Sequence, residues 1–138
     1  MLLKFTTEKT VNEASEALQS TVLANQFGVM HIHNLRETMV KKGVEFDREC
    51  LIFEVCQPKQ AKKVLDQNMS ISTALPCRIS IYEEEGKTVF AALKPTVLLT
   101  LFDTPSLNAV AHEVENSMIK IMKQAAAGKT AGLPLAIV

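Results

Sequence analysis

The fold of this chain is decided by residues 49–65, which read ECLIFEVCQPKQAKKVL. Over residues 49–56 every second side chain is apolar, which is the period of a β-strand with one face turned to a core. Pro58 follows at the first position of a helix, where its missing N–H costs nothing. The segment therefore predicts a strand that leads directly into a helix, with Cys56 at the junction. The apolar residues of the two elements are Leu51, Phe53 and Val55, then Ala61, Val64 and Leu65.

Strands and helices also alternate before this segment. A capping box that begins at Thr10 starts a helix over residues 11–25. Asn34 caps a second, shorter helix, in which we expect Leu35 and Met39 to point inward. Strands are expected at residues 2–7 and 27–33.

A β-hairpin follows the segment. Its strands are expected at residues 77–82 and 87–93, on either side of a charged turn that ends in glycine. Residues 70–75 are expected to form a loop, and residues 96–102 a helical turn or two. The chain therefore mixes helices with a hairpin, which is typical of an α+β domain with the order β-α-β-α-β-α-β-β-α.

The last helix has the clearest pattern. We expect Thr104 to cap it, Pro105 to start it and an apolar stripe to follow it to about Gln124. After this helix the residues become small and apolar, so we assign residues 1–126 to a single domain and 127–138 to a C-terminal tail. The stripe consists of Leu107, Val110, Ala111, Val114, Met118, Ile121 and Met122.

Charge and cysteine content limit the classes of protein. Fifteen basic residues balance fifteen acidic ones, which argues against a nucleic-acid partner. No stretch approaches the roughly 18 apolar residues of a membrane span. Three cysteines, an odd number, do not resemble the disulfide framework of a secreted domain, so we expect a reducing, cytoplasmic setting.

Cys56 is a candidate functional residue because a helix begins beside it. Backbone N–H groups at a helix N-terminus carry partial positive charge, which stabilises a nearby thiolate and can also hold an anion. The alternative is that Cys56 is a small apolar core residue, the commoner role of a free cysteine.

Cys77 and Arg78 begin the hairpin. Successive strand side chains point to opposite faces, so we expect these two to diverge rather than pair. The planar fork of Arg78 suits carboxylates and phosphates, which makes it a candidate anion clamp, although an ordinary surface salt bridge is an equal alternative.

His31 and His33 place two imidazoles on one face of a strand. This is an acceptable geometry for two metal ligands, which Cys56 or Cys77 would have to complete. Two histidines alone are weak support for a metal site, and the sequence assigns no cofactor.

The succession of motifs in this chain resembles the domain-of-unknown-function family numbered 302 of bacteria and archaea. The resemblance reaches to about Gln124 and implies a two-layer sandwich, with helices packed on one face of a mainly antiparallel sheet, and a homodimer; it implies no activity. The family commonly has Asn where this chain has Gln57, and Gln caps a helix poorly, so we expect a loose turn there. The motifs are Gly28-Val29-Met30-His31-Ile32-His33-Asn34-Leu35-Arg36-Glu37-Thr38, Lys42-Gly43, Phe53-Glu54-Val55-Cys56-Gln57-Pro58 and Leu75-Pro76-Cys77-Arg78-Ile79.

Three functional hypotheses follow from these residues. The first is a binding protein for a small anionic ligand held near Cys56, Pro58, Cys77 and Arg78. The second is a thiol-based enzyme or redox carrier that uses Cys56, with Cys77 as the resolving partner. The third is a metal-binding protein that uses His31, His33 and a cysteine. Whether the protein is an enzyme stays open at this point.

Overall fold

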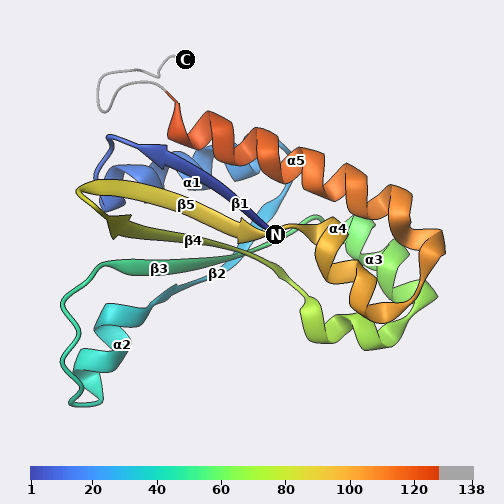
Figure 1. Cartoon of the computed structure of the whole chain (residues 1–138), viewed down its shortest axis with the longest axis horizontal. Helices are drawn as coiled ribbons and strands as arrows, with labels where there is room; N and C mark the ends of the chain where they lie inside the picture. Colours follow the sequence, from blue (N-terminus) through green and yellow to red (C-terminus); the bar gives the residue numbers. More distant parts are fainter. Residues whose placement is uncertain (128–138) are drawn as a thin grey trace.

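The structure is a computed structural model that describes residues 1–127. Strands and helices follow one another in the order expected from the sequence (Figure 1). The strands are β1 (Leu2–Thr7), β2 (Gly28–Asn34), β3 (Cys50–Cys56), β4 (Cys77–Glu84) and β5 (Lys87–Leu93). The α-helices are α1 (Val11–Ala24), α2 (Leu35–Lys41), α3 (Pro58–Gln67), α4 (Pro95–Leu98) and α5 (Asn108–Ala126), and the 3-10 helices are η1 (Met69–Ala74), η2 (Leu99–Phe102) and η3 (Pro105–Leu107).

The strands form one five-stranded antiparallel sheet in the order β1-β5-β4-β3-β2. At one end of the β3–β4 ladder Val55 lies opposite Cys77, and Glu54 lies opposite Arg78. Helices α1 and α5 pack on one face of the sheet (Figure 1). The expected α+β architecture is therefore confirmed.

The main core lies between this face and the two long helices. Its fully buried side chains include Leu18 of α1, Phe53 and Ile79 of the sheet, and Met118 of α5. Burial of each such side chain contributes roughly 1.5–3 kcal/mol. The predicted capping box is present at the start of α1, where Thr10 Oγ1 accepts from the Glu13 N–H and the Glu13 carboxylate accepts from the Thr10 N–H. The predicted apolar stripe faces this core through Val114, Met118, Ile121 and Met122 of α5, whereas Leu107 and Val110 pack in a separate, smaller cluster.

A smaller apolar cluster forms at one end of the sheet, where α3, η1 and α4 gather beside α5 (Figure 1). Its buried members are Val64, Ile71 and Leu107. Glu115 of α5 fixes the first turn of α4, because its carboxylate accepts hydrogen bonds from both the N–H and the hydroxyl of Thr96. Packing therefore holds the short helices α3, η1 and α4 together at this end of the sheet.

Three local predictions differ from the structure. Helix α2 buries no residue, and Leu35 and Met39 are only half-buried, because the helix extends away from the sheet instead of packing on its covered face (Figure 1). The expected loop at residues 70–75 is largely the 3-10 helix η1. Thr104 makes no capping bond, because its hydroxyl donates to the Phe102 carbonyl and accepts from the Asn68 amide. The 3-10 helix η3 follows Thr104, and α5 begins only at Asn108.

The C-terminal tail expected at residues 127–138 lies, except for Ala127, outside the described residues. Within residues 1–127, none of the helices combines the length and the apolar character needed to cross a membrane.

Candidate functional site

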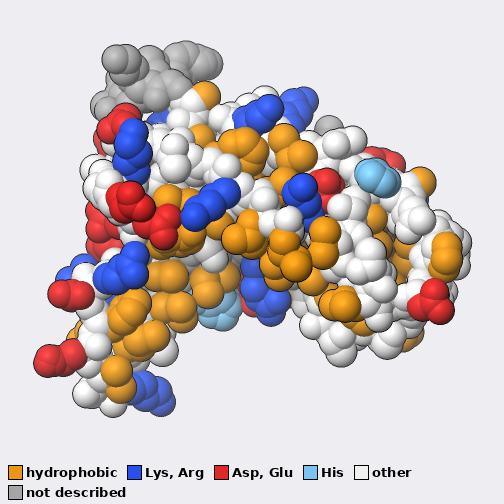
Figure 2. All heavy atoms as spheres, viewed as in Figure 1, with side chains coloured by type: hydrophobic (Ala, Val, Ile, Leu, Met, Phe, Trp, Pro, Cys, Tyr) orange, Lys and Arg blue, Asp and Glu red, His pale blue; other side chains and the backbone are white. Residues whose placement is uncertain are grey.

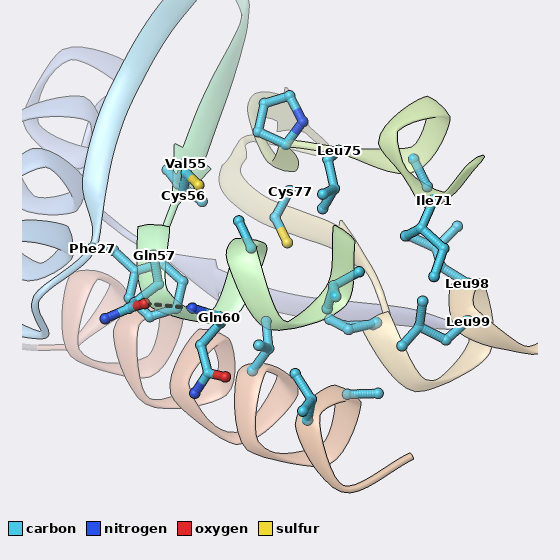
Figure 3. Close-up of a pocket in the computed structure, with 18 residues that line it drawn as sticks. Phe27, Val55, Cys56, Gln57, Gln60, Ile71, Leu75, Cys77, Leu98 and Leu99 are labelled. Atoms are coloured by element: carbon cyan, nitrogen blue, oxygen red, sulfur yellow. Dashed lines mark hydrogen bonds between the residues drawn. The ribbon is translucent and has the colours of Figure 1, made fainter. Parts of the chain in front are cut away.

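An apolar cavity of about 70 Å³ lies at the end of the sheet and is lined by residues of α3, η1, α4 and α5; it is called the inner cavity below. Figure 3 shows the sulfur of Cys77 pointing into this inner cavity, with Ile71 and Leu98 to one side. The cavity exists because three short helices, rather than one long helix, cover this end of the sheet. Its apolar lining also includes Ala61, Val64 and Val110.

The turn after Cys56 caps its own helix. The Gln57 side chain accepts a hydrogen bond from the Gln60 N–H at 2.9 Å, so the poor cap expected at this position is wrong. Glutamine has one methylene more than asparagine, and here it still reaches the third N–H of the helix. Pro58 is exposed and does not line the inner cavity. The helix N-terminus is therefore occupied by a side chain, which weakens the case for an anion at this turn.

Burial governs the chemistry of the cysteines. Burial raises the pKa of the Cys56 thiol, so the lowered pKa expected from the helix N-terminus is wrong. Burial, with a smaller contribution from Cys56, raises the pKa of Cys77 to about 11. Neither thiol is therefore an activated thiolate near neutral pH.

Cys56 and Cys77 are close, as the resolving-pair hypothesis required. Cys77 lies opposite Val55, one residue from Cys56, and Cα atoms offset in this way on neighbouring strands lie about 6 Å apart. That separation is within the range of a disulfide. All three cysteines are nevertheless free in the structure.

Gln60 presents a polar atom without a partner. Its side-chain N–H donates to the Glu113 carboxylate at 2.5 Å, while its Oε1 is buried and has no hydrogen bond among the described residues. Gln60 also lines the inner cavity. An unpaired buried oxygen of this kind costs about 1–3 kcal/mol.

A second cavity, a groove of about 380 Å³, lies on the face of the sheet opposite the main core. Its volume is within the range of about 300–1,000 Å³ of small-molecule sites. Figure 2 shows hydrophobic side chains gathered across the middle of one face of the molecule. The groove has three polar side chains, Arg78, Ser80 and Tyr82, which alternate along β4 and so share one face. Its apolar lining includes Leu2, Ile52, Ala91, Leu93 and Leu98.

Arg78 is only loosely engaged by the protein. Its guanidinium lies 3.7 Å from Glu54 Oε2, beyond hydrogen-bond distance, and the same oxygen contacts His33 Nε2 at 3.1 Å. The Arg78 side chain is 53% exposed. Cys77 and Arg78 diverge as predicted, since Cys77 packs against the main core and Arg78 points to the opposite face. The structure thus leaves the guanidinium donors available beside an apolar groove.

The histidines are close to each other but lack a third ligand. The rings of His31 and His33 lie 4.4 Å apart in an edge-on arrangement. Within the part of the chain that the structure describes, no group of three or more His, Cys, Asp or Glu residues is arranged to hold a metal ion. Cys56 and Cys77 line the inner cavity, so the structure does not assemble the expected set of ligands.

A common wall separates the groove from the inner cavity. It consists of the end of η1, the segment that leads into β4, and α4. The residues that line both cavities are Ala74, Pro76, Cys77, Pro95 and Leu98.

The sequence predicted Cys77 and Arg78 as site residues but missed Ser80, Tyr82 and Leu98. The period-2 pattern of β4 could have placed Ser80 and Tyr82 beside Arg78.

The chain matches known proteins along most of its length. A family model described as "Domain of unknown function DUF302" matches residues 3–125. The crystal structure of an uncharacterised conserved DUF302 protein from Bacillus stearothermophilus superposes with a TM-score of 0.86 at 28% sequence identity, covering 90% of this chain and 97% of that one. No curated protein matches the chain. Because the family model spans nearly all the described residues, the chain belongs to the DUF302 family of domains of unknown function.

Proposed function

We propose that the protein binds a small organic acid in the groove on the open face of the sheet, with the carboxylate at Arg78. One observation carries the proposal: loosely engaged guanidinium donors lie in the wall of an otherwise mainly apolar groove. A guanidinium matches a carboxylate in a bidentate geometry. The hydroxyls of Ser80 and Tyr82 are further polar groups on the same strand face.

This proposal moves the anionic ligand away from the Cys56–Pro58 turn. Gln57 occupies the helix N-terminus there, and the inner cavity beside it has an almost wholly apolar lining. Of the four residues first assigned to the site, Cys77 and Arg78 line the groove, whereas Cys56 lines only the inner cavity.

The thiol and metal hypotheses have less support. Burial raises the pKa of both cavity thiols, which opposes nucleophilic chemistry at neutral pH. His31 and His33 have no third ligand in the described residues. Binding without a covalent step is therefore the function that this geometry supports best.

Calorimetric titration with octanoate tests the proposal. We expect one site per chain in the wild type and at least tenfold weaker binding in Arg78→Met, since a hydrogen bond to a charged group is worth about 1.5–3 kcal/mol. Arg36→Met is the matched control, because Arg36 pairs with Glu49 and lines neither cavity. Equal affinity of Arg78→Met and wild type, or no binding to either, would overturn the proposal.

We also propose that two copies associate through the α2 surface, defined by Met30, Val40 and Val44. These side chains are 63%, 58% and 53% exposed, and α2 itself buries no residue. A helix of seven residues has little stability without packing on one face, and a second copy would supply that packing.

The mass of the protein in solution tests this association. We expect twice the chain mass by light scattering for the wild type and the mass of a single chain for Val40→Lys. Leu23→Lys is the control, because Leu23 is more exposed than Val40 but lies on α1. A monomeric wild type, or an effect of Leu23→Lys as large as that of Val40→Lys, contradicts the proposal.

A further inference from the structure

The groove and the inner cavity share lining residues, among them Leu98. This side chain is half-buried and lines both cavities. It is the last residue of α4, whose first turn is fixed to α5 by the hydrogen bonds between Thr96 and Glu115. Leu98 and the other residues that line both cavities place the two spaces side by side.

The inner cavity is too small to be a ligand site alone. Small-molecule sites have volumes of about 300–1,000 Å³, whereas this cavity has about 70 Å³. The inner cavity therefore has room for only the last carbons of an aliphatic chain. An apolar space of this size suits the end of a chain.

We propose that the groove and the inner cavity together form one site for an aliphatic carboxylate. The carboxylate lies at Arg78, next to the cavity end of β4, and the last carbons of the chain pass Leu98 into the inner cavity. Five residues line both spaces, which is why one chain can occupy the two. This inference rests on the proposed function and adds the class of acid.

The distribution of polar groups fits this order of head and tail. Arg78, Ser80 and Tyr82 all lie in the groove, and the inner cavity has only the amides of Gln57 and Gln60 among its lining. A carboxylate placed in the inner cavity would have no cation to offset its desolvation. The charged head therefore belongs in the groove and the apolar tail in the cavity.

Titration of the full chain with hexanoate and decanoate, in wild type and in Ala61→Leu, tests the inference. Ala61 lines the inner cavity and not the groove, so leucine there fills the cavity and leaves the carboxylate site intact. Each buried methylene is worth about a fourfold change in affinity. We therefore expect decanoate to bind Ala61→Leu about tenfold more weakly than wild type, and hexanoate to bind both within about twofold.

Ala109→Leu is the matched control, because Ala109 is exposed on α5 and lines neither cavity. Val110→Phe fills the same cavity from α5 and replaces Ala61→Leu if that variant does not fold. If a folded cavity-filling variant binds decanoate as tightly as wild type, and this binding still depends on Arg78, the inference is overturned and the proposed function stands. No binding of either acid to the wild type overturns both.

Discussion

The Arg78 guanidinium lies 3.7 Å from the Glu54 carboxylate, on the directly opposed position of the neighbouring strand. Glu54 is the more buried partner, and its Oε2 also contacts His33. The ion pair orients the Arg78 side chain at the groove but does not use the hydrogen-bond donors of the guanidinium. A ligand carboxylate that binds these donors therefore competes with Glu54 for the same cation.

Removal of this competitor should strengthen ligand binding. We expect Glu54→Gln to bind octanoate about fivefold more tightly than wild type, since a partly exposed ion pair is worth on the order of 1 kcal/mol. Glu16→Gln, an equal change of charge on an exposed position of α1, should leave the affinity unchanged. Weaker octanoate binding by Glu54→Gln in calorimetry would show that Glu54 positions Arg78 more than it competes with the ligand.

The contact between Glu115 and Thr96 should make stability depend on pH. Burial raises the pKa of Glu115, but the hydrogen bonds from Thr96, together with the charges of Lys94 and His112, outweigh this effect and hold the net pKa below the ordinary carboxyl value. A lowered folded-state pKa means that the contribution is present above the unfolded pKa of about 4.3 and is lost as pH falls through the folded value.

Urea unfolding of wild type and Glu115→Gln at several pH values measures this contribution. We expect the wild type to be more stable by about 1 kcal/mol at pH 7, and the difference to shrink below about pH 4. A difference that stays constant from pH 7 to pH 3 would contradict the assignment.

The cavity thiol should react slowly. Burial raises the pKa of Cys77 to about 11, whereas an unfolded cysteine has a pKa of about 8.5. In a Cys50→Ala, Cys56→Ala variant, iodoacetamide at pH 8.5 should therefore modify the folded protein at least tenfold more slowly than the urea-unfolded protein, because only the thiolate reacts. Equal rates would indicate an exposed, ordinary thiol and would restore the case for thiol chemistry.

The unpaired oxygen of Gln60 should be a cost to stability. Gln60→Met removes this buried oxygen and gives up only the bond to the exposed Glu113, so we expect a gain of about 1 kcal/mol in urea unfolding. Gln67→Met, in the same helix but exposed, is the control and should change stability little. A loss of stability in Gln60→Met alone would mean that the oxygen has a partner, such as a water molecule.

Local patterns in the sequence predicted most of the fold. The capping box at Thr10, Pro58 at the start of α3 and the alternation of β3 each depend on residues a few positions apart. The divergence of Cys77 and Arg78 followed from strand geometry in the same way. Predictions failed where a distant partner decides the outcome, as at Thr104, whose hydroxyl is engaged by Asn68.

The site was harder to predict than the fold. Its wall joins Ala74 and Leu98, which are far apart in sequence and have no pattern in common. The pKa of Cys56 depends on how deeply the fold buries it, which the adjacent helix start does not reveal. Sequence patterns identified chemically capable residues, and the tertiary structure decided which cavity each of them lines.

The central claim, that an organic acid binds in the groove at Arg78, is tested most directly by ¹H–¹⁵N NMR during a titration with octanoate. The claim predicts that the largest amide shifts occur at Arg78, Ser80, Tyr82 and Leu98, and that these shifts disappear in Arg78→Met. Shifts concentrated on α2, or shifts at the groove that persist in Arg78→Met, would contradict it.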